Sequence, residues 1–145
     1  MRTWVASGVG LVLLGAVAGT LWYVNAQDGL DEAELRAVSM EAADSVAGRE
    51  VRRHSYRAIS DAVRGAVEEA ARQRGLPVPH VGISDTESRL EEPGGYLMTY
   101  HFQLTDEQSG RQVCLVLHER EPRVDHAAFE PHITVGECAV RKARY

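Results

Sequence analysis

The feature that most constrains this chain is Thr3–Val24, an unbroken stretch without charge near the amino terminus. As a helix these residues would be roughly 33 Å long, which is enough to cross the hydrocarbon core of a bilayer. Trp4, Trp22 and Tyr23 flank the stretch as aromatic residues do at membrane interfaces. We therefore expect residues 1–27 to form a signal anchor, a single transmembrane helix.

A cleaved secretory signal is the competing interpretation, because Val24-Asn25-Ala26 offers small or aliphatic residues at a signal peptidase site. Cleaved signals usually have a shorter apolar stretch of about 7–15 residues, which favours the retained anchor. Arg2 precedes the stretch and acidic residues follow it. The positive-inside rule then predicts a cytoplasmic amino terminus and an extracytoplasmic domain, either anchored in the cell membrane or secreted after cleavage following Ala26.

Gly15 and Gly19 form a GxxxG pair inside the apolar stretch. Small residues at this spacing allow two membrane helices to approach closely. The pair therefore suggests a homodimer formed through the transmembrane helix.

Charge and length limit the rest of the chain. All 21 acidic residues lie beyond Gln27, and the whole chain of 145 residues has a formal net charge of −5. Nucleic-acid binding needs a basic face, so an acidic domain argues against that class of function. Residues 28–145 are enough for one domain with a real core.

The first helix is expected to begin after Asp31, which can cap it together with Glu34 three positions later. Gly48 is a natural stop. Because this helix has few large apolar residues, we interpret residues 28–49 as a helical stalk or linker, and residues 50–145 as the extracytoplasmic α+β domain.

A second helix is predicted from Glu50 to Arg74, before Gly75. Its apolar residues recur at the three- and four-residue spacing of a buried stripe. The stripe comprises Ile59, Ala62, Val63, Ala66, Val67 and Ala70.

Beyond residue 80 the pattern changes to the alternation of β-strands. Strands are predicted at Tyr96–Leu104, Arg111–His118 and Ile133–Val140, with a weaker one at His80–Leu90. If the first two form a hairpin, Phe102 lies opposite Val113. The predicted fold class is α+β, with an amino-terminal transmembrane helix followed by one or two helices packed on a small antiparallel sheet of three to four strands.

The two cysteines are expected to form a disulfide. The predicted register places His101 opposite Cys114, and a last strand paired with the central one brings Cys138 beside Cys114. Disulfides are typical of extracytoplasmic proteins. Closing a loop of this length would stabilise the fold by about 3 kcal/mol.

A zinc site would use Cys114, Cys138 and His118 with His101 or His132. Structural zinc sites usually take two cysteines from a close C-x(2–4)-C pair, which this chain lacks. Residues 114 and 118 would lie about 13 Å apart on one strand. We therefore expect no metal and no cofactor.

The predicted function is a non-enzymatic binding module that contacts a partner protein or ligand at the cell envelope. The predicted contact surfaces are the strand face bearing Thr99, His101 and Gln103, and the loop bearing His126 and His132. The alternatives are a small envelope hydrolase or metal-dependent enzyme that uses its histidines, and a purely structural spacer. The sequence has neither G-x-S-x-G nor H-E-x-x-H, so it predicts no catalytic residue.

Overall fold

The computed structural model describes residues 29–53, 55–90, 95–120 and 126–139. The predicted membrane segment, with Gly15, Gly19 and the cleavage position after Ala26, lies outside these ranges. Within them, no helix is long and apolar enough to cross a membrane.

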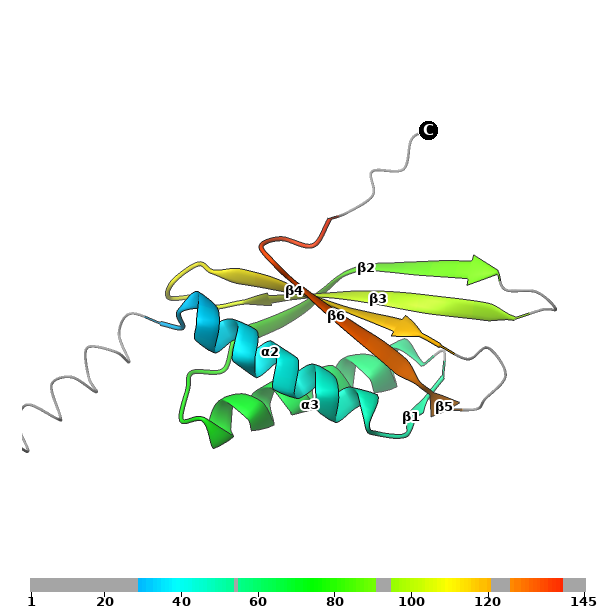
Figure 1. Ribbon diagram of the computed structural model, residues 1–145, viewed down its shortest axis with the longest axis horizontal. Helices are drawn as coiled ribbons and strands as arrows, with labels where there is room; N and C mark the ends of the chain where they lie inside the picture. Colours follow the sequence, from blue (N-terminus) through cyan, green and yellow to red (C-terminus); the bar gives the residue numbers. More distant parts are fainter. Residues whose placement is uncertain (1–28, 54, 91–94, 121–125, 140–145) are drawn as a thin grey trace, which may run out of the picture.

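The described chain consists of two helices packed on one side of a four-stranded antiparallel sheet (Figure 1). This confirms the predicted α+β class and the number of strands. The helices are α2 (Glu32–Ala47) and α3 (Tyr56–Gln73). The sheet has the order β2 (His80–Leu90), β3 (Tyr96–Thr105), β4 (Gln112–Glu119) and β6 (Phe129–Val135). A second, two-stranded sheet pairs β1 (Val51–Arg52) with β5 (His126–Ala127).

Helix α2 is part of the core, whereas the sequence suggested a stalk or linker. Its cap is as predicted, because the Asp31 side chain accepts from the Glu34 N–H and the Glu34 side chain accepts from the Asp31 N–H. Leu35, Val38 and Val46, however, are fully buried. The helix packs on α3, β4 and β6. Small residues on α2 allow this close packing, so a low content of large side chains did not indicate exposure.

Helix α3 begins at Tyr56, six residues after the predicted start at Glu50. Ser55 caps it by accepting a hydrogen bond from the Ala58 N–H. The preceding residues Val51 and Arg52 pair with β5 instead. The predicted apolar stripe is confirmed, except that Ala62 is only partly buried and Ala71 joins the buried set.

In the β3–β4 hairpin, the side chains lie on the predicted faces of the sheet, but the two strands pair in a different register. Phe102 lies opposite Leu115, not Val113, so the pairing differs by two residues. The Asp106 N–H still bonds to the Arg111 carbonyl, so the strands stay paired up to a short turn in which Gly110 has φ +71°. A shift of two residues keeps every side chain on its face, which is why Tyr100, Phe102 and Leu104 are buried as expected.

Strand β6 begins earlier than predicted and ends earlier. It runs from Phe129 through Pro131 and stops at Val135, before Cys138. Proline is tolerated here because β6 is an edge strand of the described sheet, where one side of the backbone lacks a ladder partner. Strand β2, predicted as weak, spans all eleven residues of the expected range.

Candidate functional site

The sheet face opposite the helices holds most of the predicted contact residues. Thr99 and His101 of β3 share this face with Val116 and His118 of β4, since Thr99 pairs with His118 and His101 with Val116. Both helices lie on the other side (Figure 1). We refer to the surface formed by Glu87, Arg89, Thr99, His101 and His118 as the polar face.

The centre of the polar face is an open hollow of about 650 Å³. It is lined by Glu87, Ser88, Arg89, Thr99 and His118. The Thr99 Oγ1 atom lies 2.9 Å from His118 Nδ1, so the hydroxyl fixes the orientation of an exposed imidazole. The hollow therefore offers a cation and a carboxylate from β2 and an imidazole from β4.

His101 is largely enclosed beside this hollow. Its side chain is only 14% exposed, and Nε2 lies 3.8 Å from a Glu87 carboxylate oxygen. Among the described residues, this nitrogen has no hydrogen-bond partner. The Glu87 carboxylate is thus the nearest acidic group to the enclosed imidazole of His101.

Gln103 has a structural role on the same side of the sheet. Its amide group donates to the carbonyls of Val113 and Gly136 at 3.2 Å and accepts from the Cys138 N–H at 2.7 Å. It lies opposite Cys114, the position expected for His101. Gln103 thus holds residues 136–138 against the sheet, and its amide is occupied by the protein's own backbone.

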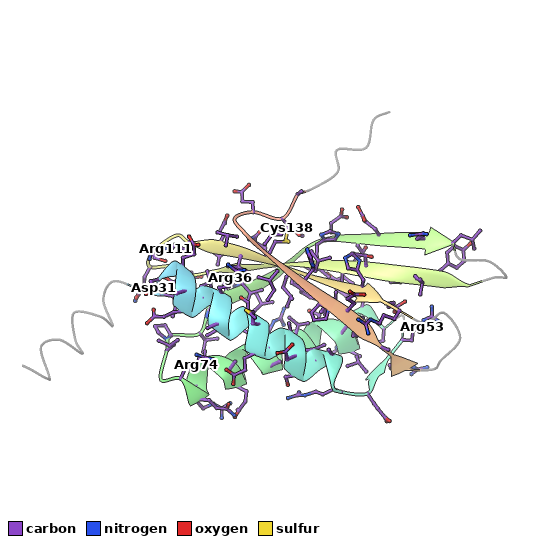
Figure 2. All side chains as sticks on the ribbon, viewed as in Figure 1. Asp31, Arg36, Arg53, Arg74, Arg111 and Cys138 are labelled. Atoms are coloured by element: carbon purple, nitrogen blue, oxygen red, sulfur yellow. A yellow bond between two sulfur atoms is a disulfide. The ribbon has the colours of Figure 1, made fainter. Side chains whose placement is uncertain are left out.

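The disulfide between Cys114 and Cys138 is confirmed, with a Cα–Cα distance of 4.9 Å. Cys138 belongs to the segment that follows β6 and crosses to the side of the sheet away from the helices (Figure 2). Thr134, not Cys138, is the strand partner of Cys114. The disulfide therefore fastens the carboxy-terminal end of the described chain to the central strand.

Of the two remaining predicted contact residues, His132 lies on the same side of the sheet as the polar face, because it pairs with Val116, whereas His126 lies in a different sheet. His126 pairs with Arg52 in the small two-stranded sheet, and its side chain lies outside the described part of the structure. His132 is exposed on β6, opposite Val116. Within the described ranges, no three His, Cys, Asp or Glu side chains are grouped so that they could hold a metal ion.

A buried charged pair lies beside the core, and sequence reasoning missed it. Glu119 is 4% exposed, and one of its carboxylate oxygens is 3.4 Å from Arg53 Nε and 2.9 Å from the Met98 N–H. Arg53 also donates to the Tyr96 carbonyl. Burial, followed by the charge of Glu119, raises the pKa of Tyr100 to about 12, although Arg53 opposes the shift. The pair joins the end of β4 to the start of β3.

A second buried carboxylate is that of Asp106, which directly follows β3. It is 3% exposed and accepts hydrogen bonds from the N–H groups of Leu30 and Ser109, at 3.1 and 2.8 Å. Arg111 donates to the Leu30 carbonyl at 3.1 Å. These contacts tie the entry of α2 to the β3–β4 turn. No local sequence signal could have revealed them, because Leu30 is 76 residues from Asp106.

Comparison with known proteins gives no relative, since no family model, curated protein or solved structure matches this chain.

Proposed function

We propose that this chain is a membrane-tethered, non-enzymatic binding module whose polar face contacts a partner protein at the outer side of the cell membrane. The observation that carries the proposal is the hollow on the helix-free side of the sheet, lined by Glu87, Arg89, Thr99 and His118. Side chains of both charges and an oriented imidazole suit recognition of a polar protein surface.

The placement outside the cytoplasm rests on two independent features. The disulfide Cys114–Cys138 is of a kind that persists in oxidising compartments and is rare in the cytosol. The apolar stretch Thr3–Val24, with Arg2 before it, favours a cytoplasmic amino terminus and an exported domain. Anchorage further requires that residues 1–26 are retained.

An intact mass of the protein from the membrane fraction tests the placement. We expect the full 145-residue mass less two hydrogen atoms, as a retained anchor and an oxidised Cys114–Cys138 pair require. A mass that lacks residues 1–26 would contradict anchorage, and a fully reduced pair would contradict the exported location.

Site-specific photo-crosslinking in intact cells tests the contact surface. A photoreactive residue is placed at Arg89 or at His118, both exposed on the polar face, and at Arg64 on the exposed side of α3 as the matched control. We expect a discrete protein adduct from Arg89 and His118 but not from Arg64. Equal adducts from all three positions, or none from any of them, would count against the polar face.

A further inference from the structure

A groove runs between α2 and the edge strand β6, on the opposite side of the sheet from the polar face. Two hollows of about 240 and 300 Å³ follow one another along it. The first is lined by Arg36, Met40, Ala43, Asp44, Pro131, His132 and Ile133. The second is lined by Glu32, Leu35, Gly110, Arg111, Gln112, Val135, Gly136 and Glu137. Because Glu32 shares a hollow with Val135 and Asp44 shares one with Pro131, α2 and β6 run antiparallel.

The hydrogen-bond pattern of β6 identifies which backbone groups face the groove. The Gly136 N–H bonds to the Gln112 carbonyl and the Ala128 carbonyl accepts from Arg120, so even-numbered residues of β6 point their backbone toward β4. The odd-numbered residues therefore point theirs outward. Ile133 and Val135 each offer an N–H and a carbonyl at this edge, whereas Pro131 offers only a carbonyl.

The helix wall of the groove presents three side chains at equal intervals. Arg36, Met40 and Asp44 are all exposed and follow one another every four residues, or about 6 Å along the helix. Neither Arg36 nor Asp44 forms an ion pair with another described residue. Met40 is 51% exposed, a large apolar group between the two charges. Figure 2 shows Arg36 on α2 near β6.

The spacing of these side chains matches that of an extended chain. Alternate residues of a β-strand lie on one face about 6.7 Å apart, close to the interval along α2. An antiparallel strand added to β6 would run in the direction of α2. Its successive helix-facing side chains would then meet Arg36, Met40 and Asp44 in that order.

We propose that β6 and α2 bind an extended segment of a partner protein with the pattern acidic-x-apolar-x-basic. The segment adds to the sheet at Ile133 and Val135 and places its acidic, apolar and basic side chains against Arg36, Met40 and Asp44. Main-chain hydrogen bonds provide affinity in such strand addition, and the alternate side chains provide specificity. This surface is separate from the polar face, so its test does not depend on the function proposed above.

A second copy of this chain fits the groove less well. Pro131 has no N–H and interrupts the row of outward N–H groups between Phe129 and Ile133, which restricts the length of a strand pair between two β6 edges. In such a pair the helix-facing side chains of the second β6 would be Pro131, Ile133 and Val135, and none of these carries a charge that could pair with Arg36 or Asp44. An added peptide with opposite charges at its two ends satisfies both Arg36 and Asp44.

Peptide binding to the purified full-length chain, measured by fluorescence anisotropy, tests the proposal. The probe is the labelled peptide TETVTRT, and the matched control is TRTVTET, which has the same composition with the charges exchanged. We expect the first peptide to bind at least about 5-fold more tightly, since the exchange turns two exposed charge attractions into repulsions. The variant Arg36→Glu/Asp44→Arg should reverse this preference, and both positions are exposed, so folding should be unaffected.

N-methylation of the peptide tests the backbone pairing independently of charge. The valine N–H would face β6, so methylating it should abolish binding, whereas methylating the next threonine should leave binding unchanged because that N–H faces solvent. Equal affinity of the two peptides, equal effects of the two methylations, or no binding at millimolar peptide would overturn the proposal. A dimer in sedimentation that dissociates in the Arg36→Glu/Asp44→Arg variant would also overturn it, by assigning the groove to a second copy.

Discussion

The Asp106 carboxylate and the Leu30 backbone N–H form a buried hydrogen bond of 3.1 Å across 76 residues of sequence. The same carboxylate oxygen accepts from the Ser109 N–H. Both ends of the contact are fixed, one at the start of α2 and the other in the β3–β4 turn. The bond therefore couples the start of the helix layer to the β3–β4 end of the sheet.

Replacing Asp106 with Ala should destabilise the domain by about 2–4 kcal/mol, because two buried N–H groups lose a charged acceptor. Asp106→Asn keeps one acceptor oxygen, so its loss of unfolding free energy should be clearly smaller than that of Asp106→Ala. Urea unfolding followed by far-ultraviolet circular dichroism measures the difference. Equal stability of the Ala variant and the wild type would show that water replaces the carboxylate without cost.

Stability should also fall in acid through this residue. Burial alone would raise the pKa of Asp106, but hydrogen bonds from Ser109 and Leu30, with the charge of Arg111, lower it overall. A depressed pKa in the folded state stabilises the fold above the unfolded value of about 3.9, and this stabilisation is lost as the pH falls through the folded pKa. Below about pH 4, the urea midpoint of Asp106→Asn should therefore fall less steeply with decreasing pH than that of the wild type. If the urea midpoints of the two proteins fall equally with decreasing pH, the loss of stability in acid belongs to other carboxylates.

Gly29 should be intolerant of any side chain, for a reason beyond its backbone angle. Its φ is +72°, and a Cβ there would overlap Asp106 Oδ2 and lie 2.9 Å from the Ser109 nitrogen. Gly75 is a matched control, with φ +64° and no atom within 4 Å of its Cβ position. Gly75→Ala should cost about 1 kcal/mol of unfolding free energy through backbone strain, and Gly29→Ala at least about 2 kcal/mol more. Equal losses of unfolding free energy in the two variants would mean that the turn around Asp106 rearranges to accommodate the new side chain without an energetic cost.

These contacts explain which parts of the fold were predictable. The Asp31–Glu34 cap and the alternating face of Tyr100, Phe102 and Leu104 depend on residues close in sequence, and both were predicted correctly. The hairpin register was wrong by two residues because the strands stay paired up to Asp106 and Arg111, across a turn shorter than the predicted strand ends at Leu104 and Arg111 implied. The burial of α2 depends on its neighbours in space, which a count of its large apolar residues does not report.

The candidate site was predictable to a similar extent. Alternation placed Thr99 and His101 on one face, and the structure keeps them together. Glu87 joins them through the β2–β3 pairing, whose register shifts between Ile83 and Asp85. An irregularity of this kind reverses the faces of the residues that follow, so alternation along the sequence could not assign Glu87 to the polar face.

Removing the disulfide with Cys114→Ser/Cys138→Ser should lower the free energy of unfolding by about 3 kcal/mol, the chain-entropy value for a loop of this length. A reducing agent should destabilise the wild type by a similar amount and leave the double variant unchanged. Because the Gln103 amide also holds residues 136–138, the double variant should still fold. Loss of the whole fold in the double variant would show that the disulfide is needed for more than closing this loop.

Tyr100 should make the domain sensitive to alkali. Its pKa is raised to about 12, chiefly by burial and then by the Glu119 carboxylate, so the folded state retains the phenolic proton after the unfolded chain has lost it. Stability is then fully present below about pH 10 and falls as the pH rises toward 12, by about 2–3 kcal/mol in total. Tyr100→Phe keeps the edge-to-face contact with Phe129 and should remove this decline. Urea midpoints between pH 8 and pH 11 measure the slope, and an unchanged slope in the Phe variant would assign the alkaline loss to another group.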